Sequence, residues 1–269
     1  MRLLKYFLIA GSVFLFSCHK SDQAPNNTGY STPNQYTGYT LIWSDEFSGS
    51  AIDENNWSFE TGNNNGWGNN ELEYYTNSAN NAFVSDGNLI IEARAEAVGG
   101  FNFSSARMIT KGKKSFKYGR IDIRAKLPQG KGIWPALWML GDNIDAVGWP
   151  TCGEIDMMEL IGQQPNIIYG TLHWGPTTGH FYGKTLGLSS GTFGDSFHVY
   201  TMKWTASSIE LLVDDVPYLL MDTTTGNFPF NQNFFFIFNI AVGGDFPGPP
   251  DLSTPLPQRM LVDYVRVFQ

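Results

Sequence analysis

Three carboxylates stand close together in the stretch "GEIDMMELIG", residues 153 to 162. Alternate side chains of a regular β-strand share a face, so Glu154 and Asp156 would point to one side and Glu159 to the other. A β-bulge at the two methionines would set two residues opposite one on the partner strand and return Glu159 to the face of Glu154. We therefore predict a bulged strand that aligns three acids.

Two glutamates on one face can cleave a glycosidic bond. Retaining glycosidases hold their two carboxyl groups about 5 to 5.5 Å apart, and inverting enzymes about 6.5 to 9.5 Å. Two long side chains on a bulged strand favour the shorter separation, and Asp156 between them would help to keep one partner protonated. A solvated acidic face is the plain alternative. A transition-metal site is disfavoured because this strand carries no histidine at ligand spacing.

Short alternating segments separated by turn residues must position this strand. Residues 120 to 127, "RIDIRAKL", alternate charged and apolar side chains and predict a half-exposed antiparallel strand. Asp214-Asp215 indicates a hairpin turn, and residues 234 to 242 are apolar on both faces, as in a strand inside a sandwich. Amphipathic helices are not evident, and 29 Gly and 14 Pro favour many turns. We predict an all-β fold, a sandwich or β-jelly roll.

The N-terminus predicts export. Residues 1 to 17 combine two cations with an apolar stretch too short to span a bilayer comfortably, which is typical of a signal peptide. The Leu-x-Ser-Cys ending resembles a bacterial lipobox, so Cys18 is the expected lipidation site; ordinary cleavage near Cys18 is the alternative. Residues 18 to 38 contain no Val, Ile, Leu, Met or Phe and read as a disordered tether, which leaves residues 39 to 269 as one domain. We expect a cell-envelope lipoprotein at the outer membrane or the cell surface.

Charge and cysteine content exclude some classes of protein. The net charge of -8 becomes more negative once the basic signal peptide is removed, so a nucleic-acid partner is not expected. With Cys18 lipidated, Cys152 is left without a disulfide partner. Cys152 stands beside a Pro-Thr turn, where a small packing residue is a simpler interpretation than a nucleophile.

Aromatic residues accompany the acids. The chain has eight Trp and 12 Tyr, several of them in polar, glycine-rich surroundings such as "NNNGWGNNELEYYT". Trp134 and Trp138 would share a strand face, so both indoles could line one groove and stack on sugar rings. Either indole could also belong to the core.

The acid motif resembles the Glu-x-Asp-x-x-Glu signature of glycoside hydrolase family 16, in the bulged form of the laminarinases, which are endo-β-1,3-glucanases. The blocks "WGNNELEYYT", "GIWPALWML", "TLHWG", "FIFNIAVGGDFPG" and "LVDYVRVF" resemble other blocks of the family in the same order, over about residues 41 to 268. The resemblance implies a concanavalin A-like β-jelly roll with a concave substrate cleft, and a β-glucan as the substrate.

The resemblance also implies roles for individual residues. Glu154 would be the nucleophile, Glu159 the general acid/base and Asp156 the residue that assists the nucleophile, with no cofactor needed for catalysis. Four further residues would lie near sugar subsites: Arg107, Trp134, Trp138 and His173. A surface ion pair for Arg107 and a core position for His173 are the alternatives.

Some family members hold a structural Ca²⁺, and the matching ligands here would be Glu46, the carbonyl of Gly87 and Asp263. Asp263 alternates in phase with Val265 and Val267, and a carboxylate on that buried face would need a partner or a cation. Calcium is therefore an open expectation at this position.

Several readings remain beside the β-1,3-glucanase. The same chemistry could act on mixed-linkage β-1,3-1,4-glucan, agarose, carrageenan or xyloglucan, although the bulged motif disfavours classical lichenases. A non-catalytic glycan-binding lipoprotein is the alternative from another class, but such relatives usually lose one of the acids. The expected partners are the polysaccharide and, through the lipid anchor, a membrane; a monomer is expected.

Overall fold

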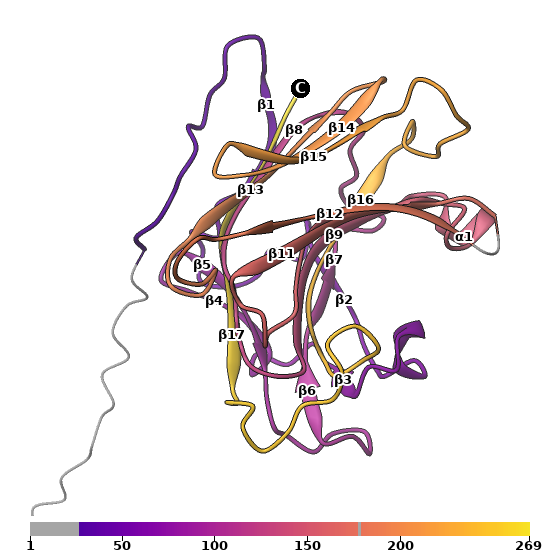
Figure 1. The fold of residues 1–269 in the computed structure, drawn as a ribbon. Coiled ribbons are helices and arrows are strands. Elements are labelled where there is room, and N and C mark those ends of the chain that lie inside the picture. The colour runs from indigo at the N-terminus through magenta and orange to yellow at the C-terminus, as the bar shows by residue number, and fades with distance from the viewer. Residues whose placement is uncertain (1–26, 177–178) are drawn as a thin grey trace, which may run out of the picture.

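The computed structural model describes residues 27–176 and 179–269, and two large antiparallel sheets form most of it (Figure 1). The eight-stranded sheet, here called the back sheet, has the order β15-β14-β13-β8-β17-β5-β4, with β1 beside β17. Its strands are β1 (Leu41–Asp45), β4 (Ala82–Ser85), β5 (Asn88–Ala93), β8 (Gly119–Lys126), β13 (His198–Trp204), β14 (Ser208–Val213), β15 (Val216–Asp222) and β17 (Gln258–Phe268).

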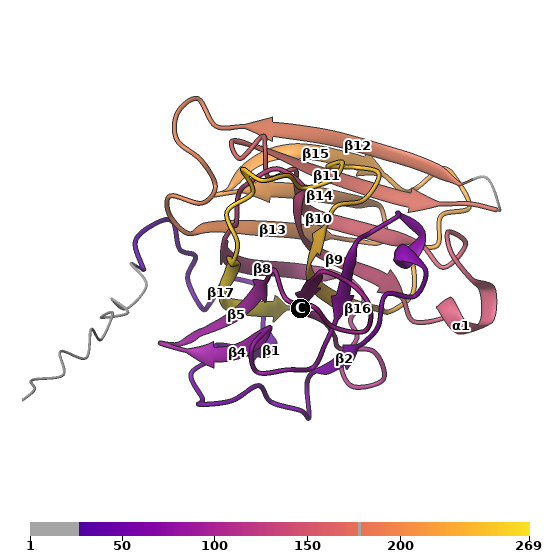
Figure 2. The ribbon, with the colours of Figure 1, turned by 90° about the horizontal axis from the view of Figure 1, so that it is seen from below.

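The seven-stranded sheet, here called the cleft sheet, has the order β12-β11-β10-β9-β16-β7-β2. Figure 2 shows β12, β11 and β10 side by side. Its strands are β2 (Ser58–Glu60), β7 (Arg107–Ile109), β9 (Ile133–Gly141), β10 (Glu154–Leu160), β11 (Ile167–Trp174), β12 (His180–Gly187) and β16 (Phe234–Val242).

Helical structure in the described residues is confined to a 3-10 turn, Gly66–Gly68, and the four-residue α1, Ile144–Val147. A small parallel pair, β3 (Glu73–Tyr75) and β6 (Phe103–Ser105), completes the fold. None of the helices in the described part of the chain has the length and apolar character that crossing a bilayer requires. The all-β jelly-roll prediction is confirmed.

The core lies between the two sheets and follows from strand alternation. In β8, Ile121 and Ile123 are fully buried there. In β16, Phe236 and Phe238 fill the core while Asn239 points to the cleft side, and every residue of this strand is buried. Each buried aliphatic or aromatic side chain contributes about 1.5–3 kcal/mol to folding. The predicted fully buried strand at 234 to 242 is confirmed.

The outer face of β8 departs from the sequence prediction. We expected its charged residues to be solvated, but Arg120, Asp122 and Arg124 are only 7%, 0% and 4% exposed. Residues 27 to 38, which we assigned to the tether, lie against this face (indigo in Figure 1). That part of the tether prediction was wrong, and residues 1–26 are outside the described part.

Tyrosines explain why this N-terminal segment is held. The Tyr36 hydroxyl donates to Asp122 at 2.7 Å, and its ring lies 4.2 Å from the guanidinium carbon of Arg120. The Tyr30 carbonyl accepts a hydrogen bond from Arg124 at 2.6 Å. The prediction counted aliphatic side chains, whereas this contact depends on hydroxyl groups, carbonyl groups and cation–π packing.

A β-bulge interrupts β17 where it pairs with β8, between Val262 and Tyr264. The residues that face the core therefore change from even to odd positions along the strand: Met260, Val262, Val265 and Val267. We expected Asp263 to share the buried face of Val265. This was wrong, because the bulge leaves Asp263 on the outer face, where it pairs with Arg124 at 2.8 Å.

Candidate active site

The predicted bulge in β10 is present. Asp156 pairs with Trp138 of β9, and Glu159 pairs with Ala136. A step of three residues along β10 therefore faces a step of two residues along β9. The register against β11 shifts between the same two acids. Both intervening methionines are buried in the core. Glu154, Asp156 and Glu159 consequently project from one face of the cleft sheet.

These acids lie where two hollows of the cleft sheet meet. One hollow, of about 410 Å³, reaches toward the loop around Trp67 and the start of β7. The other, of about 680 Å³, reaches across β11 and β12 to Phe181. Six residues line both hollows: Asn69, Trp134, Trp149, Glu154, Asp156 and Glu159. The acids therefore sit near the middle of one continuous cleft.

Indole N–H groups hold the two glutamates. Trp149 donates through Nε1 to Oε2 of Glu154 at 2.7 Å, and Trp134 donates through Nε1 to Oε1 of Glu159 at 3.0 Å. Trp134 was expected near the sugar, whereas the position of Trp149 was not predicted. Its signal was a Trp-Pro pair only five residues before an acid. Trp149 is 57% exposed, which is unusual for a large indole without a ligand-binding task.

Burial and mutual repulsion change the acidity of all three carboxyl groups. Burial, then the charge of Asp156, raises the pKa of Glu154 to about 8. Burial, then the charge of Glu154, raises the pKa of Glu159 to about 7. Burial and the charge of Glu159 also raise the pKa of Asp156 well above its usual value. The cluster therefore keeps protons at neutral pH, as an acid catalyst requires.

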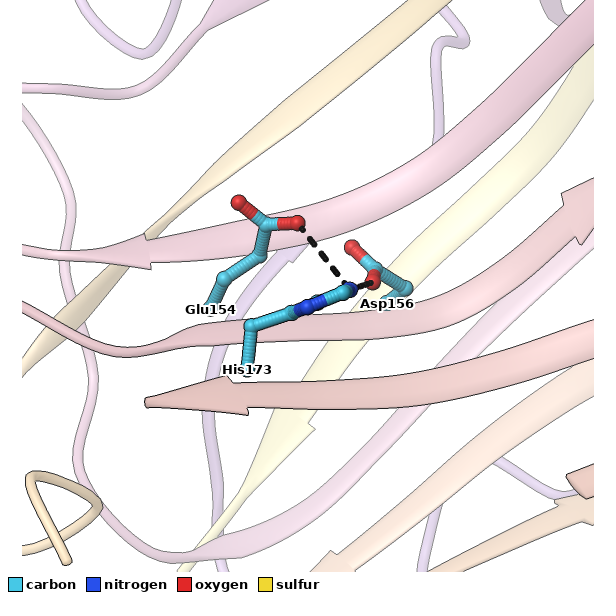
Figure 3. Close-up of side chains that lie close together, drawn as sticks. All are labelled: Glu154, Asp156 and His173. Atoms are coloured by element: carbon cyan, nitrogen blue, oxygen red, sulfur yellow. Dashed lines mark ion pairs between the residues drawn. The ribbon is translucent and has the colours of Figure 1, made fainter. Parts of the chain in front are cut away.

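His173 reaches the cluster from the neighbouring strand. It pairs in register with Glu154, and its Nε2 lies 3.3 Å from Oδ2 of Asp156 and 3.7 Å from Oε1 of Glu154 (Figure 3). No histidine stands at ligand spacing on β10 itself, so this pairing across two strands was not predicted. His173 is half-buried on the cleft face and is not a core residue.

Arg107 forms part of one wall of the cleft. Its guanidinium carbon lies 4.7 Å from the rings of both Trp67 and Trp138, and its Nε donates to Glu60. Trp138 in turn donates to Oδ1 of Asn239 at 2.8 Å. Arg107 is thus a buried ion-pair member as well as a cleft residue, and Glu60 and Asn239 were not anticipated.

The asparagine-rich loop before β3 supplies the end of this wall. Asn64, Asn65 and Trp67 all have left-handed backbone conformations, with φ of 46°, 56° and 52°. Asparagine tolerates this region better than most residues, which explains the composition of the loop. The Asn63 side chain fastens the loop by donating to the carbonyls of residues 71 and 73. The loop holds Trp67 over Arg107.

The predicted calcium ligands lie elsewhere, along the back sheet. Both carboxylate oxygens of Glu46 accept hydrogen bonds from Arg266, at 2.9 and 2.7 Å, and Asp263 is paired with Arg124. Gly87 occupies the turn between β4 and β5. As placed, these residues do not fit a Ca²⁺ site, because arginine already neutralises both carboxylates that would attract the ion.

Cys152 has no catalytic geometry. Cys152 is fully buried, and its burial, followed by the charge of Glu154, raises the pKa of its thiol to about 11. The thiol thus stays protonated at neutral pH and is a poor nucleophile. Cys18 lies outside the described residues.

Known proteins resemble this chain over most of its length. The family model described as "Glycosyl hydrolases family 16" matches residues 67–264. A beta-glucanase of Rhodothermus marinus is 41% identical over 93% of this chain and 88% of that protein. A glucan endo-1,3-beta-glucosidase of Cryptopygus antarcticus is 41% identical over 78% of this chain and 83% of that protein.

Solved structures agree as well. The laminarinase catalytic domain from Thermotoga maritima superposes with a TM-score of 0.80 at 46% identity, covering 86% of this chain and 98% of that one. The laminarinase from Rhodothermus marinus gives a TM-score of 0.80 at 40% identity, covering 86% and 97%. Since the family model spans well over half of the sequence, this chain belongs to glycoside hydrolase family 16.

Proposed function

We propose that the protein is an endo-acting hydrolase of β-1,3-glucan that retains the anomeric configuration. The observation that carries this proposal is the bulge in β10, which directs three acids with raised pKa values into one aromatic cleft. The relatives described as laminarinases and glucan endo-1,3-beta-glucosidases support the choice of glycan.

In the first step Glu159 gives its proton to the glycosidic oxygen while ionised Glu154 attacks the anomeric carbon. The bond from that carbon to the leaving oxygen breaks and a glycosyl-enzyme ester forms. In the substrate-free cleft the pKa of Glu154, about 8, lies above that of Glu159, about 7, so this step uses the form of the pair in which the proton is on Glu159. The indole of Trp149 and the nearby imidazole of His173 favour that form because both lower the pKa of Glu154. Asp156 lies beside Glu154, and its negative charge helps to retain a proton in the cluster.

In the second step Glu159, now ionised, removes a proton from water, and the resulting hydroxide attacks the anomeric carbon. The ester to Glu154 breaks and the sugar leaves with its original configuration. Carboxylates and water suffice for both steps. On the back sheet we propose that Arg124 and Arg266 take the place of a structural Ca²⁺ by neutralising Asp263 and Glu46.

Endo action is supported by a cleft that continues on both sides of the acids. On one side Arg107 and Trp138 would contact sugar, with Trp67 at the end of the wall. On the other side His173 and Phe181 would do so. A polysaccharide could therefore cross the cleft without presenting a chain end.

The location proposed is the cell envelope, with residues 1 to 17 removed and Cys18 lipidated, and the protein is proposed to be a monomer. Replacement Cys18→Ser should move the protein from the membrane fraction to the soluble fraction of expressing cells. A wild-type protein that is already soluble would remove the lipid anchor from the proposal and leave ordinary export.

The activity is tested by sizing the products released from laminarin, barley mixed-linkage glucan and agarose. A ladder of short oligomers from laminarin, with slower release from barley glucan, is expected. Glu154→Gln should lower kcat by about 10⁴-fold or more, because the nucleophile is lost. Glu210→Gln, on the back sheet, should leave kcat unchanged. Products from barley glucan or agarose alone would overturn the choice of glycan, and an active Glu154→Gln would overturn the mechanism.

A further inference from the structure

Glu154, Asp156 and His173 bring one ligand atom each to a common point. Two carboxylate oxygens and the imidazole Nε2 all lie within 4.8 Å of one another (Figure 3). The histidine comes from β11 and the acids from β10, and register pairing fixes their relation. Within the described residues, this is the group of three such side chains that is spaced to hold a metal ion.

The spacing suits a small transition-metal ion. Zinc bonds to nitrogen and oxygen are about 2.0–2.1 Å long, so neighbouring ligand atoms of a tetrahedral site lie about 3.3–3.4 Å apart. The observed distances from Nε2 are 3.3 Å to Asp156 and 3.7 Å to Glu154. All three ligand atoms lie within 4.8 Å of one another, so side-chain rotations that bring them together would close the site, and the fourth position would face the cleft and take water.

A buried carboxylate oxygen that accepts no hydrogen bond points to the same place, and its charged neighbour there is Nε2 of His173, 3.3 Å away. Oδ2 of Asp156 is buried and accepts no hydrogen bond from the described residues, although Asp156 is only 3% exposed. Buried carboxylate oxygens without a donor are costly, and a cation would satisfy this one. Trp149 binds the other oxygen of Glu154, so Oε1 remains directed at His173.

We propose that the catalytic cluster is also an inhibitory site for Zn²⁺ and similar first-row divalent ions, held by Glu154, Asp156 and His173. A bound ion takes the lone pairs of the nucleophile, so glucan cleavage and metal binding exclude each other. The ligand set of one imidazole and two carboxylates favours Zn²⁺ over Mg²⁺ or Ca²⁺, which prefer six or more oxygen ligands.

Isothermal titration calorimetry of the purified protein with ZnCl₂ tests binding without reference to activity. One ion per chain is expected. His173→Gln should weaken it by about tenfold or more, because losing a direct ligand costs at least as much as losing an outer-shell partner. His180→Gln is the matched control, since this histidine lies on β12 beside Trp174 and outside the cluster. Unchanged Zn²⁺ binding by His173→Gln, or its loss in His180→Gln, would overturn the site.

The inhibitory part rests on the proposed function and is tested separately by laminarin kinetics. Zn²⁺ should lower kcat/KM, EDTA should reverse the effect, and equal concentrations of MgCl₂ should have none. An unchanged kcat/KM at Zn²⁺ concentrations that saturate the site in calorimetry would contradict inhibition through the nucleophile. If laminarin is not cleaved, the proposed function fails, while the calorimetric result on the metal site still stands.

Discussion

The cleft and the back sheet each contain a buried aspartate, Asp156 and Asp122, but the acids of the two regions are balanced differently. On the back sheet Asp122, Asp263 and Glu46 each meet an arginine. Within the described residues, the cleft acids Glu154 and Glu159 have no lysine or arginine within ion-pair distance. They accept hydrogen bonds from indole N–H groups instead. Arginine fixes a carboxylate in its ionised form, whereas a neutral donor fixes its position and leaves its charge free to change.

The pH dependence of the two regions should therefore have opposite signs. On the back sheet burial alone would raise the pKa of Asp215, but hydrogen bonds from Tyr30 and Arg120 lower it. The stabilising effect of ionised Asp215 is present at pH values above the pKa that it has in the unfolded chain. This effect is lost as the pH falls through the lowered pKa of the folded state. The raised pKa values of Glu154 and Asp156 act the other way. Their contribution is greatest below the unfolded pKa and is lost as the pH rises through the folded pKa.

The largest effect on stability is expected from Asp122→Asn. Asp122 accepts hydrogen bonds from Arg120, Tyr36 and Thr201 and has no exposed surface. An amide cannot neutralise Arg120, and breaking a buried ion pair costs about 3–5 kcal/mol in the free energy of unfolding. Urea unfolding followed by tryptophan fluorescence measures this change.

The control for this variant is Asp145→Asn, which breaks the exposed pair with Lys111. That pair should contribute less than about 1 kcal/mol. A similar loss in both variants would show that burial of the pair on the back sheet is unimportant, and the comparison between the two regions would fail.

The same exchange in the cleft, Asp156→Asn, should have the opposite effect on stability. The neutral amide removes the repulsion with the neighbouring glutamates, so the melting temperature should rise by several degrees at pH 9 and little at pH 5. The kcat on laminarin should fall by about 10²-fold, because the group that tunes the acids is lost. A lower melting temperature at pH 9 would show that ionised Asp156 stabilises the fold.

Trp149→Phe should have a smaller effect, confined to the chemistry. Loss of the N–H donor raises the pKa of Glu154 further, so the acidic limb of the kcat profile should move to higher pH. A hydrogen bond to a charged group contributes about 1.5–3 kcal/mol, which corresponds to roughly tenfold or more in kcat. Val147→Ala, exposed at the end of α1 and two residues before Trp149, should leave the profile unchanged. An unshifted limb in Trp149→Phe would mean that the indole binds sugar only.

The two bulges show how far the sequence leads. The bulge in β10 was predictable, because Glu154 and Glu159 must share a face to act on one bond. Regular alternation along a strand would place them on opposite faces. The bulge in β17 was not, because apolar residues on both sides of Asp263 allow either phase. His173 and Trp149 join the acids through strand pairing and a loop, which spacing along one strand does not reveal. The docked segment with Tyr30 and Tyr36 was missed because it contacts buried charges and not an apolar core.

The smallest effect is expected from calcium, and it tests the back sheet directly. With Asp263 paired to Arg124 and Glu46 paired to Arg266, 5 mM CaCl₂ or EDTA should leave the melting temperature unchanged. A ligand that binds only the folded state raises stability with the logarithm of its concentration, so a true site would give a steady rise. In that case calcium must displace the arginines from the two carboxylates, and Arg124→Met should increase the rise in melting temperature that CaCl₂ causes. If neither protein responds, arginine is the counter-charge of this sheet, and the contrast with the cleft stands.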